Sequence, residues 1–183
     1  MAGFTDRVKG KQQVSSASVQ QFGKGTAQTP GGGQIFSTQA STGIQLANVQ
    51  TESTMATYSL PPNSLDAPGR NLWITAFGNF PRTDNNPRQA KLTFGSKSIT
   101  IAQSTTAGAA QSWCLQYTVS KSSNNAQVLM TQVVLSSLHG GMTISTGNET
   151  DTAAIAIKVT GTSTAAAAVG DVVLYNLQVQ ALN

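Results

Sequence analysis

The sequence predicts an all-β fold in which an extended N-terminal arm precedes an antiparallel β-sandwich. Apolar and polar residues alternate with period two along several segments after residue 34, which is the pattern of half-buried strands. Clusters of Gly, Pro, Asn, Asp and Ser separate these segments at short intervals. Charged residues make up 10% of the 183 residues, too few for a long-helix protein. A chain of this length is expected to form a single core.

The arm comprises residues 1–33, and the sandwich domain comprises residues 34–183. The arm has few large apolar residues and ends in the breaker sequence Pro30-Gly31-Gly32-Gly33. It therefore cannot bury enough apolar surface to offset the entropy of ordering its own backbone. We expect a neighbouring subunit to hold it, with aromatic side chains in pockets and cationic ones on acidic surface. The partner-binding residues predicted in the arm are Phe4, Arg7, Lys9, Lys11 and Phe22.

The first half of the sandwich domain alternates strands with turn sequences. Strands are expected at Gln34–Thr38, Thr54–Leu60, Asn71–Gly78, Ala90–Phe94 and Lys97–Ala102. The last two meet at Gly95-Ser96, which is the strongest hairpin signal in the chain. In the third strand, Trp73 and Phe77 have the opposite phase to the apolar residues beside them. They are expected on the outer face, either as a ligand platform or, as we favour, covered by a second subunit.

The second half continues the same pattern. Strands are expected at Trp113–Ser120, Gln127–Ser136, Met142–Ser145, Ile155–Val159 and Val173–Ala181. The side chains on the apolar phase of the first and last of these strands are predicted to lie in the core, including Trp113, Tyr117, Val173, Tyr175, Leu177 and Val179. The short run Ala165–Ala168 has no helical apolar stripe, so a loop or a single turn is expected there.

The titratable residues show no spacing typical of catalysis or metal binding, so we predict no enzyme, no cofactor and no metal. Glu149 and Asp151 are the one close pair of acids; a cation site is conceivable, but a solvated loop is favoured because no calcium-loop spacing surrounds them. His139 is the sole histidine, and a turn or interface role is expected. Cys114 is the sole cysteine and is expected to be a small buried hydrophobic residue rather than a nucleophile.

The basic character of the chain belongs to the arm. Four cationic residues, Arg7, Lys9, Lys11 and Lys24, face one acid, Asp6, within an overall net charge of +4. A nucleic-acid-binding arm normally clusters more Lys and Arg, so we predict no direct nucleic-acid partner. No apolar run approaches the roughly 18 residues of a membrane span. The N-terminus lacks the hydrophobic core of a signal peptide, which predicts assembly in a cytoplasm and no membrane partner.

Three segments, Asn71–Gly78, Ala90–Gly95 and Gly170–Val179, resemble the jelly-roll virion proteins of tailed bacteriophages. The similarity covers roughly residues 71–183. It implies a jelly-roll sandwich without catalytic residues. The most similar members are capsid cement or decoration proteins, which typically sit as trimers on the outside of the head. The resemblance thus implies a homotrimer on the capsid exterior that binds the major capsid protein, although the long polar arm departs from the smallest decoration proteins.

Two other functions stay open at this stage. Fibre, collar and tail accessory proteins belong to the same broad group, and the pattern does not separate them cleanly, so a phage tail, collar or fibre component is the alternative to a cement protein. A carbohydrate-binding jelly-roll module is a third interpretation. It requires an exposed aromatic platform, for which Trp73 and Phe77 are the candidates.

Overall fold

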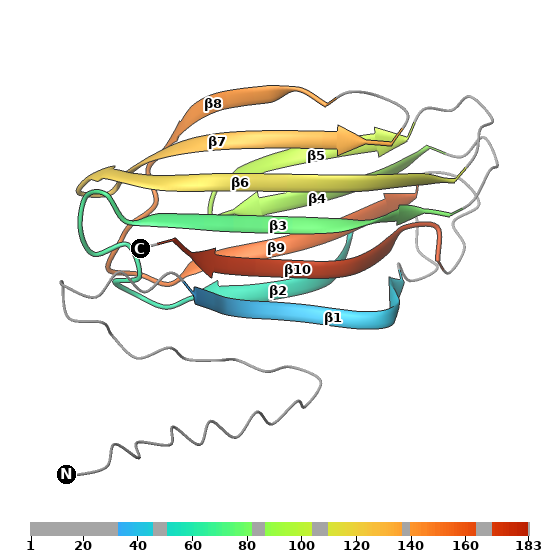
Figure 1. The fold of residues 1–183 in the computed structure, drawn as a ribbon, viewed down its shortest axis with the longest axis horizontal. Helices are drawn as coiled ribbons and strands as arrows, with labels where there is room; N and C mark the ends of the chain where they lie inside the picture. Colours follow the sequence, from blue (N-terminus) through green and yellow to red (C-terminus); the bar gives the residue numbers. More distant parts are fainter. Residues whose placement is uncertain are drawn as a thin grey trace, which may run out of the picture.

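The computed structural model describes residues 33–45, 51–81, 87–103, 110–136, 140–163 and 170–182, and these residues form two antiparallel sheets. The six-stranded sheet has the order β1-β10-β3-β6-β7-β8, and the four-stranded sheet has the order β2-β9-β4-β5. The two sheets pack face to face (Figure 1). The strands are β1 (Gly33–Gln45), β2 (Ser53–Leu60), β3 (Asn71–Phe80), β4 (Arg88–Phe94), β5 (Lys97–Gln103), β6 (Gln111–Ser123), β7 (Ala126–Leu135), β8 (Met142–Gly147), β9 (Ile155–Ser163) and β10 (Val173–Ala181). The predicted all-β sandwich is confirmed.

The strand pairing is that of a jelly roll. The antiparallel pairs β1–β10, β2–β9, β3–β6 and β4–β5 together form one long hairpin. Its two halves run side by side from the β1–β10 pair to the β4–β5 turn. Rolling that hairpin up creates the additional pairs β10–β3 and β9–β4. Strands β7 and β8 lie between β6 and β9 in the chain and add to one edge of the six-stranded sheet. They are therefore an insertion into the jelly roll.

The core lies between the two sheets and follows the predicted alternation along most strands. On β3, Leu72, Ile74 and Ala76 point inward, and β6 contributes Trp113 and Tyr117. The predicted β4–β5 hairpin is also confirmed, because Phe94 pairs with Lys97 across Gly95-Ser96. Gly95 has a φ of +56°, a left-handed conformation that glycine adopts without strain. Because these residues pack together in the core, the two sheets are fixed relative to each other, and so are the side chains on their outer faces.

The prediction that Tyr175 lies in the core is wrong. A β-bulge separates Leu174, which pairs with Gly78, from Asn176, which pairs with Phe77. The extra residue reverses the alternation, so Leu174 is fully buried while the side chain of Tyr175 is 37% exposed. Val173 is buried but does not belong to the core cluster, whereas the predicted positions of Leu177 and Val179 in the core are confirmed.

Candidate subunit interface

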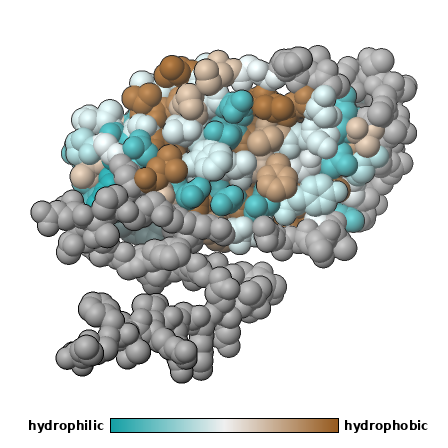
Figure 2. All heavy atoms as spheres, in the orientation of Figure 1, coloured by the Kyte–Doolittle hydropathy of each residue, from teal (hydrophilic) through white to brown (hydrophobic). Residues whose placement is uncertain are grey.

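The outer face of the six-stranded sheet carries the exposed large hydrophobic residues. In the part of the chain that the structure describes, all of them lie on the strands of this sheet or directly after β10. They are Trp73 and Phe77 on β3, Val128 and Val134 on β7, Met142 and Ile144 on β8, Tyr175 on β10, and Leu182. Figure 2 views this face and shows apolar side chains among neutral polar ones. Contiguous exposed apolar surface marks interaction sites on soluble domains.

The same sheet is almost free of charge. Its six strands contain a single charged residue, Lys121, and that side chain is buried. The four-stranded sheet differs, because its strands carry three partly exposed lysines, Lys91, Lys97 and Lys158, in addition to the buried Arg88. Depletion of charge together with exposed aromatic residues and methionine is the composition of the centre of a protein–protein interface. We call the outer surface of β3, β6, β7, β8 and β10 the neutral face.

Cross-strand register organises the neutral face into rows. One apolar row joins Phe77, Cys114 and Val134, which are direct neighbours on β3, β6 and β7. A second row runs from Trp73 through Thr118 and Met130 to Ile144. Between these rows lies a polar row made of Gln178, Thr75, Gln116 and Gln132. The face thus alternates apolar stripes with uncharged hydrogen-bonding groups.

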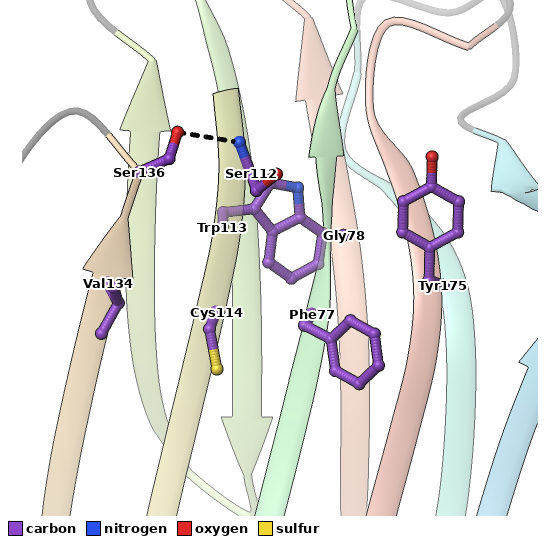
Figure 3. A pocket seen from close by; sticks show the side chains of 8 residues that line it. All are labelled: Phe77, Gly78, Ser112, Trp113, Cys114, Val134, Ser136 and Tyr175. Carbon is purple, nitrogen blue, oxygen red and sulfur yellow. Dashed lines mark hydrogen bonds between the residues drawn. The ribbon is translucent and has the colours of Figure 1, made fainter. Parts of the chain in front are cut away.

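One end of the neutral face is hollowed into an open depression of about 360 Å³ (Figure 3). Phe77 and Tyr175 project beside it, and the indole of Trp113 lies at its floor against Gly78. A Cβ atom at Gly78 would lie 1.9 Å from the carbonyl oxygen of Val173 and 2.5 Å from the Trp113 ring. Glycine is therefore required there. Trp113 Nε1 is buried and has no hydrogen-bond partner within the described residues.

Cys114 lies on the neutral face and not in the core, contrary to the expectation of a buried residue. Its side chain is half-buried between the strands that carry Phe77 and Val134. Burial raises the pKa of its thiol. The reactive thiolate is disfavoured at neutral pH as a result, so the chemistry of this residue fits apolar packing better than nucleophilic attack.

Asp151 and Glu149 hold structural hydrogen bonds and do not form a solvated loop. Asp151 is 6% exposed and pairs with the ammonium group of Lys121. Its carboxylate also accepts hydrogen bonds from the Asn125 backbone N–H at 2.7 Å and from Gln127 Nε2 at 3.2 Å. These contacts join the loop after β8 to the turn before β7, at the base of the inserted hairpin. Within the described residues, no group of three or more His, Cys, Asp or Glu side chains could hold a metal ion.

Glu149 caps the β4–β5 turn from the same loop. Its carboxylate accepts hydrogen bonds from both the backbone N–H and the hydroxyl of Ser96, at 2.6 and 2.5 Å. The expectation of a solvated loop was wrong because spacing along the chain does not show that Glu149 and Asp151 contact residues of other turns, which are distant in the sequence. The loop after β8 is thus tied to both sheets, and it holds the inserted hairpin in place.

The predicted partner-binding residues Phe4, Arg7, Lys9, Lys11 and Phe22 lie outside the described residues, as do His139 and Ala165–Ala168. The outward position of Trp73 and Phe77 is confirmed. Sequence reasoning did not single out Val128, Val134, Met142 or Ile144. The available signal was that Gln127–Ser136 has apolar residues in both phases, so one apolar set had to face outward.

The described residues include no helix long and apolar enough to span a membrane. Comparison of the chain with protein-family models, with curated proteins and with solved structures found no match.

Proposed function

We propose that this protein is a structural virion protein of a bacteriophage, a capsid cement or decoration protein that binds the major capsid protein and stabilises its lattice from outside the particle. The observation that carries the proposal is the neutral face, where exposed aromatic and aliphatic side chains occupy a sheet whose one charged side chain is buried. A surface of this composition suits protein subunits better than ionic ligands. The resemblance of residues 71–183 to phage jelly-roll proteins supplies the particular partner.

The described acidic side chains support a structural role over a catalytic one. Glu52 pairs with Lys91 at 2.5 Å and accepts a hydrogen bond from Thr160, and these contacts lower its pKa. Asp171 is fully buried and accepts a hydrogen bond from Ser163. Together with the contacts of Glu149 and Asp151, these interactions commit carboxylates to joining strands and loops, which favours a rigid assembly module.

Two attachments working together would strengthen binding to a lattice. The arm, residues 1–33, leads into β1, which begins at Gly33, and supplies a second contact in this proposal. Its aromatic and cationic residues named above would contact neighbouring capsid subunits. Linking two modest contacts in one chain makes the second intramolecular, which raises the overall affinity by orders of magnitude without one large interface. In this proposal the neutral face makes the apolar contact, and the arm extends to bind neighbouring capsid subunits.

Electron cryo-microscopy of the intact particle tests this proposal. The expected result is density for the sandwich on the head exterior, in copy numbers that follow the capsid lattice. Density confined to a ring or fibre at the tail would instead support the alternative of a tail, collar or fibre component. Purified particles that contain no copy of the chain would overturn the virion assignment altogether.

Carbohydrate binding is a second candidate because the neutral face does expose an aromatic platform. Trp73, Phe77 and Tyr175 are each more than a third exposed. The polar row beside them offers amide groups that could bond sugar hydroxyls, and sugar rings stack on aromatic faces. A glycan array separates the two functions, since saturable binding that is lost on Trp73→Ala would favour the carbohydrate module. Binding to capsid protein alone would favour the cement protein.

A further inference from the structure

The two sheets have four edges, and three of them carry features that discourage pairing with another strand. β1 has register shifts between Gln34 and Phe36 and between Gln39 and Ile44. β2 has one between Thr54 and Ala56. β5 is regular but begins at Lys97, an edge lysine. Bulges and charges are the devices by which natural sheets protect their edges.

β8 has none of these features. It pairs with β7 without a register shift and contains no charged residue and no proline. Every residue from Met142 to Thr146 is exposed, on both faces of the sheet. Met142 and Ile144 are 67% and 71% exposed, more than any other large hydrophobic residue that the structure describes. An edge that is regular, neutral and apolar, and that no other described strand pairs with, is a template for strand addition.

The backbone groups available at this edge follow from the β7–β8 pairing. The Val133 N–H donates to the Gly141 carbonyl oxygen at 3.2 Å, and the Thr131 hydroxyl donates to the Thr143 carbonyl oxygen at 3.2 Å. The backbone N–H and C=O groups of Gly141, just before β8, and of Thr143 and Ser145 within it are therefore directed toward β7. The residues between them, Met142, Ile144 and Thr146, direct their N–H and C=O groups toward the free edge.

We propose that a second copy of this chain occupies the edge, with β8 pairing antiparallel to its own counterpart about a two-fold axis beside Ile144. This register pairs Ile144 with Ile144 of the second copy, and Met142 with Thr146 of the second copy. All of the free-edge backbone groups of these residues are then paired. The apolar side chains of Met142 and Ile144 stay on one side, so the neutral faces of the two copies become continuous.

The absence of charged residues on β7 and β8 favours pairing with a second copy over pairing with a charged segment. A two-fold contact sets each residue near its own copy, so a charged residue close to the axis would face a like charge, which destabilises cross-strand pairs. β8 and its neighbour β7 contain no charged residue, so this repulsion is absent. A charged partner segment, including the cationic arm, would find no opposite charge on these two strands.

This contact is independent of the capsid proposal, because it concerns the isolated protein. A two-fold strand pairing closes on two copies. It therefore predicts a dimer in solution, in place of the trimer that the resemblance implies. Failure of the dimer would leave capsid binding untouched, and failure of capsid binding would leave the dimer untouched.

Disulfide trapping tests the register in the full chain with Cys114 replaced by Ser. Ile144→Cys is expected to form a covalent dimer under mild oxidation, because residues paired across antiparallel strands have Cα atoms about 5.5 Å apart. Thr146→Cys is the matched control on the same edge. Its two copies would lie about 14 Å apart, four residues along the strand, and should not be linked. A mixture of Met142→Cys and Thr146→Cys chains should be linked again. Equal trapping of Ile144→Cys and Thr146→Cys, or no trapping of Ile144→Cys, overturns the proposal.

Analytical ultracentrifugation at micromolar concentration gives the second measurement. The wild-type chain is expected to sediment as a dimer and Ile144→Lys as a monomer, because two ammonium groups would meet at the axis. Ser98→Lys adds the same charge on the edge strand β5 and should remain dimeric. Circular dichroism of Ile144→Lys should match the wild type, since the residue is exposed. A monomeric or trimeric wild type, or a dimeric Ile144→Lys, rules out the two-fold pairing.

Discussion

Replacing Lys121 by Met should destabilise the sandwich substantially through the base of the β7–β8 hairpin. The side chains of Lys121 and Asp151 are 3% and 7% exposed. Removing one member of a buried ion pair leaves an uncompensated charge, which costs about 3–5 kcal/mol. Asp151 keeps two hydrogen bonds from neutral donors, Asn125 N–H and Gln127 Nε2, so the lower end of that range applies. We expect a loss of about 3 kcal/mol, a large part of the roughly 5–15 kcal/mol that stabilises a domain.

Urea denaturation followed by tryptophan fluorescence measures the effect. With a slope of about 2 kcal/mol per molar, the midpoint should fall by about 1.5 M. Asp151→Asn should have a similar cost. The double variant Lys121→Met/Asp151→Asn should lose clearly less than the sum of the two, because the lone charge is gone. A midpoint within 0.3 M of wild type for Lys121→Met, or strictly additive losses, would refute the assignment of a buried coupled pair.

Further expectations concern the core, the face and the arm. Leu177→Asp should unfold the domain, since an unpaired buried charge costs several kcal/mol, whereas Gln178→Asp on the outer side should melt near wild type. Gly78→Ala should lower the melting temperature because its Cβ would meet the Val173 carbonyl oxygen, and an unchanged melt would contradict that packing. Burial raises the pKa of Tyr117 from 10.0 to about 12; the neutral phenol is favoured in the folded state, so its stabilising effect is complete below pH 10 and is lost as pH rises toward 12. Absorbance titration near 295 nm should show that late ionisation, and Tyr117→Phe should remove it. Deleting residues 1–33 should leave the melt unchanged but weaken binding to heads assembled without the chain; equally tight decoration would place attachment on the sandwich alone.

Local periodicity was sufficient to predict the sandwich. Strict alternation in Asn71–Gly78 and Trp113–Ser120 placed Trp113 and Tyr117 inside and Trp73 and Phe77 outside, as found. The β4–β5 hairpin followed from its glycine turn. Such features depend on residues that are close together in the chain. Because successive side chains of a strand point to opposite faces of the sheet, the local pattern of apolar residues shows which side is buried.

Non-local pairing accounts for what the sequence did not predict. The bulge beside Tyr175 depends on the register in which β10 pairs with β3, and no residue type in that segment indicates a bulge. The meeting of Asp151 with Lys121 depends on the folded path of the chain. Met142 and Ile144 are exposed because they lie on the outer face of an edge strand. Thr143 and Ser145, on the opposite side of β8, are exposed because the inserted hairpin extends one sheet beyond the other, which is a property of topology rather than of local pattern.

Binding of face variants to heads assembled without the chain tests most directly whether the neutral face is the subunit-binding surface. Phe77→Lys places a charge in an apolar row of the neutral face, beside the depression, and Ser59→Lys places the same charge at an exposed position of the four-stranded sheet. Loss of an aromatic hot-spot contact typically costs at least about 2 kcal/mol, or roughly 30-fold in affinity. Co-sedimentation should therefore show a weakening of that order for Phe77→Lys and wild-type binding for Ser59→Lys. Wild-type binding by Phe77→Lys, with a matching melting curve, would contradict the claim that this face contacts the capsid.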